Sequence, residues 1–185
     1  MSKLALSSGR LEVAAIMAIS RLFFLRVPSE ALPLQWSGQQ SSVALTDKKV
    51  EIKLERRKNT SGPVVMRRSC VCASSGKELC PVHLLVALAG RRRVGAVFTM
   101  SRTTFISEIR ELARSISHEH ASFVGTHAFR RGMARDILAR GGSLATLMQA
   151  GGWTSSAFQL YLRNEQLQDT AVGHFLIEVS SSGEE

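Results

Sequence analysis

The stretch THAFRRGMARDILARGGSLATLMQAGGWTSSAFQLY, residues 126–161, decides how the end of this chain folds and what chemistry it can perform. Its apolar residues recur at helical spacing, and two Gly-Gly pairs interrupt them. The pattern predicts one helix over 126–140, a short helix over 143–149 and another over 155–163. This part of the chain is therefore expected to be helical.

Four side chains of this stretch have the chemistry needed to cleave a phosphodiester. His127 and Arg130 are three residues apart, so on a helix they share a face and can reach one phosphate together. Trp153 offers an indole N–H donor. Tyr161, the only tyrosine of the chain, offers a phenol that becomes a nucleophile when it loses its proton. Together they point to metal-independent cleavage through a covalent intermediate.

The order His-x-x-Arg-Arg-Gly, Gly-Gly-Trp and Tyr resembles the tyrosine recombinase (phage integrase) family, and the resemblance extends over residues 11–163. The segment LRVPSEALPL, residues 25–34, resembles the first-arginine motif of that family. In the family, two Arg, a Lys, a His and a His or Trp surround the scissile phosphate that the Tyr attacks. The implied catalytic residues here are Arg26, Lys58, His127, Arg130, Trp153 and Tyr161.

The resemblance also implies a supporting role for Glu30 beside Arg26. Lys58 lies where the family places a lysine in a hairpin, within a run that includes Lys53. Arg56 and Arg57 are expected to bind DNA, and Arg131 is expected either to contact the DNA backbone or to be a solvated residue.

Each implied role agrees with the chemistry of the side chain. Arg26 and Arg130 would hold the non-bridging oxygens, whose charge deepens in the transition state. His127 would act as a base or orient its neighbours, and the ammonium of Lys58 would protonate the departing 5′ oxygen. The product is a 3′-phosphotyrosyl link that a second 5′-hydroxyl can reverse, so no cofactor is expected.

Charge supports a nucleic-acid partner. The chain has 24 Lys and Arg against 15 Asp and Glu, a net charge of +9. Between residues 48 and 68 there are eight basic residues against two Glu, and 91–93 is a second basic cluster. Residues after Arg163 include five acidic side chains and no Lys or Arg. This asymmetry predicts a surface that binds double-stranded DNA.

The remaining pattern predicts a mainly α fold with a small antiparallel β-sheet (α+β). Helical periodicity covers 10–25, 81–89 and 103–117, and a further helix is expected over 28–34. Alternating apolar residues predict strands within 43–54, and a turn cluster separates them from a short strand at 64–66.

In domain terms, residues 1–163 are expected to form the catalytic domain, with no evident N-terminal clamp domain. Residues 164–185 form an acidic C-terminal segment, which we hypothesise docks on a neighbouring protomer in a dimer or tetramer on DNA. No apolar run reaches the length of a membrane span, and no secretory signal is evident. An intracellular location with the DNA is expected, which is the nucleus in a eukaryote.

Two spacings differ from the common family pattern. The interval from Arg26 to Glu30 is one residue longer, and the interval from Trp153 to Tyr161 is one residue shorter. The second resembles recombinases of eukaryotic mobile elements. Two alternatives stay open: a truncated, non-catalytic DNA-binding domain, and a type IB topoisomerase-like enzyme.

The three cysteines lie close together in the sequence, and a disulfide framework is not expected in a chain without an export signal. Cys70, Cys72, Cys80 and His83 have the ligand types for zinc. However, Cys-x-Cys is tighter than the usual zinc spacing. The favoured interpretation is therefore ordinary packing, with Cys70 and Cys72 on a strand and the other two at a helix start.

Overall fold

The chain divides into two compact units, Met1–Phe129 and Arg130–Glu185, each of which is described by itself. The computed structural model describes residues 1–38, 40–46, 48–58, 60–70, 72, 80–90 and 93–153. This described part is mainly helical with a three-stranded antiparallel sheet, so the predicted α+β class is confirmed. Within it, no helix has both the length and the apolar character needed to cross a membrane.

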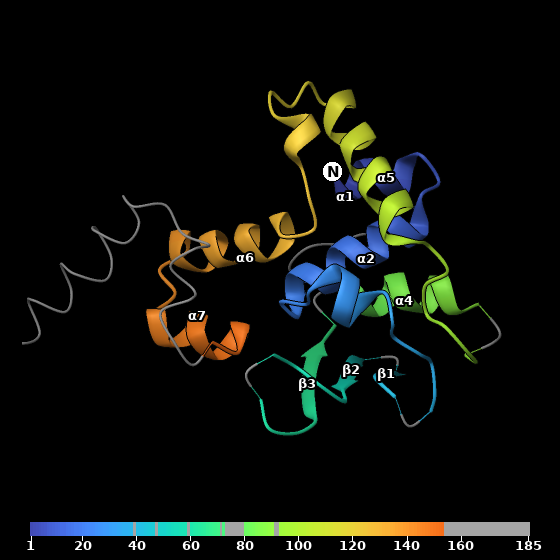
Figure 1. Cartoon of the computed structure of the whole chain (residues 1–185), viewed down its shortest axis with the longest axis vertical. Helices are drawn as coiled ribbons and strands as arrows, with labels where there is room; N and C mark the ends of the chain where they lie inside the picture. Colours follow the sequence, from blue (N-terminus) through green and yellow to red (C-terminus); the bar gives the residue numbers. More distant parts are fainter. Residues whose placement is uncertain are drawn as a thin grey trace, which may run out of the picture. The chain divides into compact units, whose positions relative to one another are not determined.

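The first unit is organised around α2 (Leu11–Leu22), which contacts α1 (Ser2–Ser7), α4 (Pro81–Ala89) and α5 (Arg102–Ser115) (Figure 1). Residues on every side of α2, from Val13 to Ser20, are buried, which explains why it is apolar almost all round. The predicted helices over 10–25, 81–89 and 103–117 are confirmed, with ends that differ by at most three residues. The sequence did not predict α1.

The sheet has the order β1 (Ser42–Leu45), β2 (Lys49–Leu54) and β3 (Val64–Ser69). Both pairs are antiparallel. Every second residue of β2 is buried against the core, namely Val50, Ile52 and Leu54, and the residues between them face the other side. The strand predicted at 64–66 is confirmed and continues to Ser69.

Polar contacts fix the start of α5 relative to α2. The Glu12 carboxylate accepts hydrogen bonds from the backbone N–H groups of Thr99 and Met100, at 2.5 and 2.8 Å. Ser101 caps α5 by accepting from Thr104 N at 3.1 Å. A further helical turn, η3 (Ala121–Phe123), follows α5.

The second unit begins at the third residue of α6 (Ala128–Ala139), and α6 is followed by α7 (Leu144–Gly151). Gly141 has φ +76°, which ends α6 as predicted. Ser143 caps α7 by accepting from Thr146 N at 3.1 Å, and Gly152 ends it in a left-handed conformation. The helix predicted over 155–163 lies outside the described residues.

Candidate functional site

Arg26, the implied first arginine, is held by a buried carboxylate in the first unit. Glu30 is 3% exposed, and its Oε1 lies 2.6 Å from Nη1 of Arg26. Its Oε2 accepts the backbone N–H of Arg26 at 2.8 Å. The Arg26 side chain remains about a quarter exposed. Glu30 therefore fixes both the backbone and the side chain of Arg26 and leaves part of the guanidinium accessible.

The backbone between these two residues forms a π-helical turn, η1 (Val27–Ala31). Ala31 N and Leu32 N donate to the carbonyl oxygens five residues before them, at 3.1 and 2.9 Å. A π turn is wider than an α turn and accommodates an additional residue, and such turns are frequent at functional sites. The helix predicted over 28–34 is therefore a shorter and wider turn than expected. This wider turn lets the Glu30 side chain reach Arg26 although the interval between them is long.

Arg57 is the second cation on Glu30, and the sequence did not predict this. Its side chain is buried, with Nε 3.8 Å from Glu30 Oε1 and Nη2 donating to the carbonyl oxygen of Phe24 at 3.3 Å. Phe24 has φ +52°, an uncommon conformation for a residue with a side chain. Burial lowers the pKa of Arg57 from its ordinary value, and Glu30 opposes that effect.

Arg56 and Lys58, on either side of Arg57, have exposed side chains on the connection between β2 and β3. Lys58 thus lies in the hairpin, where the resemblance implies the catalytic lysine. The direction of the side chains alternates here: the Arg57 side chain is buried, and the side chains of its two neighbours are exposed. DNA contact by Arg56 and Arg57 stays a prediction, and of the two only Arg56 presents an exposed side chain.

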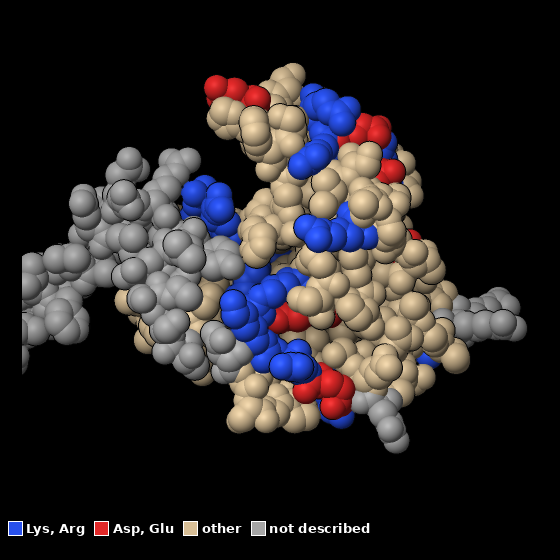
Figure 2. All heavy atoms as spheres, viewed as in Figure 1, with Lys and Arg blue, Asp and Glu red and all other residues tan. Residues whose placement is uncertain are grey.

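Other members of the basic cluster are engaged by the protein itself. Arg67 Nε lies 2.6 Å from Glu51 Oε2, and Lys53 Nζ lies 2.6 Å from Glu55 Oε1. Arg68 is half-buried, and its guanidinium lies 5.3 Å from the ring centre of Phe23. On the face drawn in Figure 2, basic side chains form several groups, some beside acidic ones.

In the second unit, Arg130 and Trp153 are in contact. Arg130 is 1% exposed, its guanidinium carbon lies 5.1 Å from the ring centre of Trp153, and Nη2 donates to Gly151 O at 3.3 Å. Trp153 is 8% exposed. A flat guanidinium stacked on an indole combines a cation–π attraction with close packing. The two residues therefore hold each other in place.

Gly151 makes this packing feasible. A Cβ on Gly151 would lie 1.9 Å from Cζ3 and 2.1 Å from Cε3 of Trp153. The indole therefore occupies the space that any larger residue would need. The Gly-Gly-Trp segment thus has a packing role in addition to ending α7.

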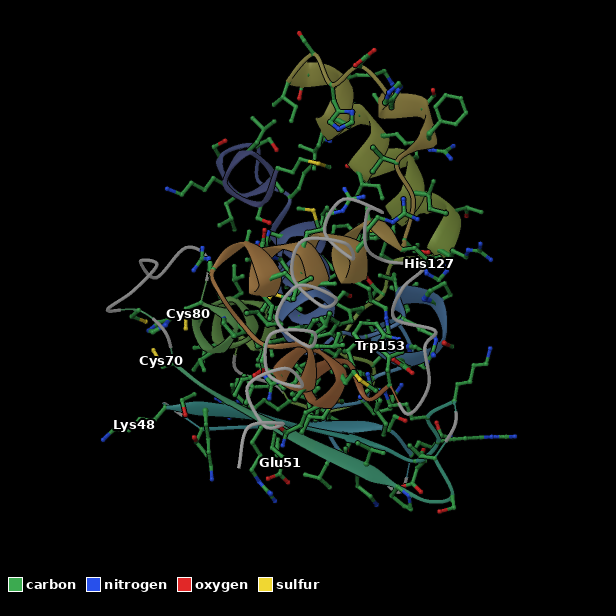
Figure 3. The ribbon with its side chains drawn as sticks, turned by 90° about the vertical axis from the view of Figure 1, so that its left-hand side faces the viewer. Lys48, Glu51, Cys70, Cys80, His127 and Trp153 are labelled. Carbon is green, nitrogen blue, oxygen red and sulfur yellow. The ribbon has the colours of Figure 1, made fainter. Side chains whose placement is uncertain are left out.

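The other implied residues of this region are placed as follows. His127 is exposed, in the first unit, at the residue before α6, and Figure 3 labels it. Arg131 is an exposed residue of α6 in the second unit. Tyr161 lies outside the described residues.

The three cysteines and His83 form a cluster in the first unit. Cys70 directly follows β3, and Cys80 precedes α4, whose third residue is His83 (Figure 3). One ligand atom from each of the four residues lies within 4.8 Å of the other three. None of these three cysteines forms a disulfide bond. A hydrogen bond to Cys70 and burial raise the pKa of Cys72 to about 12.

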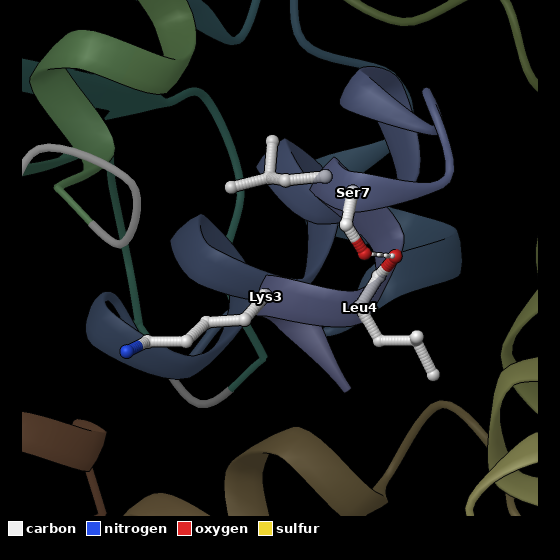
Figure 4. A pocket seen from close by; sticks show the side chains of 4 residues that line it. Lys3, Leu4 and Ser7 are labelled. Atoms are coloured by element: carbon white, nitrogen blue, oxygen red, sulfur yellow. Dashed lines mark hydrogen bonds between the residues drawn. The ribbon is translucent and has the colours of Figure 1, made fainter.

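A surface pocket lies on α1, where Lys3, Leu4, Leu6 and Ser7 line it (Figure 4). The Ser7 hydroxyl donates to the Leu4 carbonyl oxygen at 3.0 Å. None of these four residues belongs to the predicted site.

No protein-family model matches the chain, and a search of curated proteins finds no match either.

Proposed function

We propose that this chain is a tyrosine recombinase catalytic domain, which breaks and rejoins DNA for site-specific recombination or integration. The observation that carries the proposal is the bidentate hold of Glu30 on Arg26. A buried carboxylate that binds both the backbone and the guanidinium pre-orients the remaining N–H groups of Arg26. Such pre-orientation is what stabilises charge in a transition state.

The Arg130–Trp153 pair supports the proposal independently. Arg130 is the residue that the resemblance assigns to the second phosphate contact, and its partner Trp153 is the residue assigned as indole donor. Their mutual packing means that neither side chain is an ordinary solvated surface residue. A rigidly held guanidinium loses little freedom when it binds phosphate.

In the proposed reaction, the Tyr161 oxygen attacks phosphorus and gives up its proton, with His127 as base or orienter. The bond from phosphorus to the 5′ oxygen breaks, and Lys58 gives a proton to that oxygen. Arg26 and Arg130 neutralise the non-bridging oxygens. A 5′-hydroxyl of another strand then attacks the 3′-phosphotyrosyl bond, which restores the phosphodiester and frees Tyr161.

A nicked suicide substrate tests this proposal. Cleavage near the nick releases a short strand that carries the 5′-hydroxyl, and once that strand is lost the covalent intermediate cannot be reversed. We expect an adduct on a denaturing gel with the wild-type chain and none with Tyr161→Phe. Since Tyr161 is the only tyrosine, peptide mapping of the adduct must locate the DNA on it.

Each other outcome identifies an alternative. An adduct that persists in Tyr161→Phe rules out the assigned nucleophile. DNA binding without any adduct supports a non-catalytic binding domain. Relaxation of supercoiled DNA without strand exchange between two sites supports a type IB topoisomerase-like enzyme.

A further inference from the structure

Two pairs of metal-binding side chains converge in the first unit. Cys70 and Cys72 follow β3, which ends at Ser69, and Cys80 and His83 lie at the start of α4. The Sγ of Cys72 lies 2.8 Å from Cys70 Sγ and 3.0 Å from Nδ1 of His83. The Sγ of Cys70 lies 3.5 Å from Cys80 Sγ and 3.9 Å from the same Nδ1.

These distances approach the edges of a zinc-sized tetrahedron. With zinc–sulfur bonds of about 2.3 Å and zinc–nitrogen bonds of about 2.0 Å, tetrahedral geometry separates ligand atoms by about 3.5–3.8 Å. The four ligand atoms all lie within 4.8 Å of one another. Side-chain adjustments of about an ångström would therefore bring them into coordination.

The backbone around the cluster is already ordered by other contacts. Cys70 N donates to Lys48 O at 2.7 Å, which extends the pairing of β3 with β2. Cys80 is fully buried, and its carbonyl oxygen accepts from Leu84 N at 3.0 Å in the first turn of α4. Pro81 restricts the backbone at the same turn. The fold therefore positions Cys70 and the start of α4, with Cys80 and His83, without a metal.

We propose that Cys70, Cys72, Cys80 and His83 bind one zinc ion that clamps the end of β3 to the start of α4. Three thiolates and one imidazole select zinc over magnesium or calcium, which prefer oxygen ligands. Four protein ligands leave no position for a substrate, so the site is structural. The inference does not depend on the proposed DNA cleavage.

The test uses the full chain, expressed without a polyhistidine tag and purified under a phosphine reductant. Elemental analysis after dialysis against a weak chelator should find about one zinc per chain. Replacement by cobalt should give the intense visible bands of a tetrahedral site and a thiolate-to-cobalt charge-transfer band. The cobalt spectrum is measured on the wild type and needs no variant to fold.

Variants then assign the ligands. Cys72→Ser and His83→Gln should each lose most of the bound zinc. With cobalt, each variant should also lose most of the visible absorption that the wild type shows. His118→Gln changes an exposed histidine elsewhere and should retain both. Tyr161→Phe should also bind zinc normally, which separates this result from the cleavage reaction.

Three results would overturn the zinc site. The first is a wild-type chain that holds no zinc and gives cobalt no thiolate band. The second is retention of full metal content by both ligand variants. The third is an intact mass two hydrogens lower without reductant together with no metal uptake when reduced, which would identify the cluster as a redox-active thiol pair.

Discussion

The indole of Trp153 packs against the α-carbon of Gly151, in the position that a Cβ of residue 151 would occupy. Gly151→Ala must therefore displace the indole, and with it the surface on which Arg130 stacks. We expect a loss of about 1–3 kcal/mol in the free energy of unfolding, the usual cost of overpacking. Urea unfolding, followed by tryptophan fluorescence in a Trp36→Phe background, reports on Trp153 alone.

Gly132→Ala is the matched control, because a Cβ there meets no heavy atom of the described residues within 4 Å. Gly132 lies inside α6, so alanine should stabilise by up to about 1 kcal/mol. Equal effects of the two substitutions would contradict the packing argument.

Glu30→Gln should strongly destabilise the first unit. The substitution keeps the shape of the side chain but removes the charge that Arg26 and the buried Arg57 share. Breaking a buried ion pair in this way costs about 3–5 kcal/mol. Thermal unfolding of Glu30→Gln should be compared with that of Glu55→Gln, whose partner Lys53 is exposed. The exposed pair should contribute less than about 1 kcal/mol, and a similarly small effect at Glu30 would refute a structural role for its charge.

Arg130→Lys should impair both folding and the proposed cleavage. Lysine keeps the charge but loses the flat surface that contacts Trp153 and the donor to Gly151 O. We expect adduct formation to fall by about a hundred-fold or more. Arg131→Lys, at an exposed position of the same helix, should form adduct nearly as the wild type does. If the two variants behave alike, Arg130 does not contact the phosphate.

Lys58 can be tested as the general acid by changing the leaving group. Lys58→Ala should slow adduct formation by about a hundred-fold with ordinary DNA. In a substrate with sulfur in place of the bridging 5′ oxygen, the leaving group is a thiolate, which needs no proton. This substrate should therefore restore the rate of adduct formation by Lys58→Ala. Lys53→Ala should be nearly normal with both substrates, because Lys53 is paired with Glu55. If Lys53→Ala instead forms adduct slowly with ordinary DNA and at the normal rate with the sulfur substrate, Lys53 is the general acid.

Much of the fold could be predicted from the sequence because its signals are local. Pro81 and Gly90 bracket α4, and Ser143 caps α7, as the sequence predicts. The helix α1 could not be predicted in this way, since six residues do not form a stable helix alone and depend on packing against α2.

Parts of the site depend on contacts that no local pattern records. Arg57 looks like its neighbours Arg56 and Lys58 in the sequence, and only the distant Glu30 and Phe24 distinguish it. The alternation of exposed and buried side chains in β2 is the one sequence signal that sets an inward-directed side chain apart from its neighbours in this region. The cysteine cluster is a second case: the spacing of Cys70 and Cys72 in the sequence does not show that Cys80 and His83, at the start of α4, lie close to them.

The π turn after Arg26 has a consequence for detecting related chains. Arg26 and Glu30 meet at hydrogen-bonding distance although the interval between them is one residue longer than in the common pattern of the family that we propose for this chain. A motif search that demands a fixed interval would pass over any chain with this insertion. A search that allows an inserted residue between the arginine and the acid, and asks whether the carboxylate returns to the arginine's own N–H, would retain it.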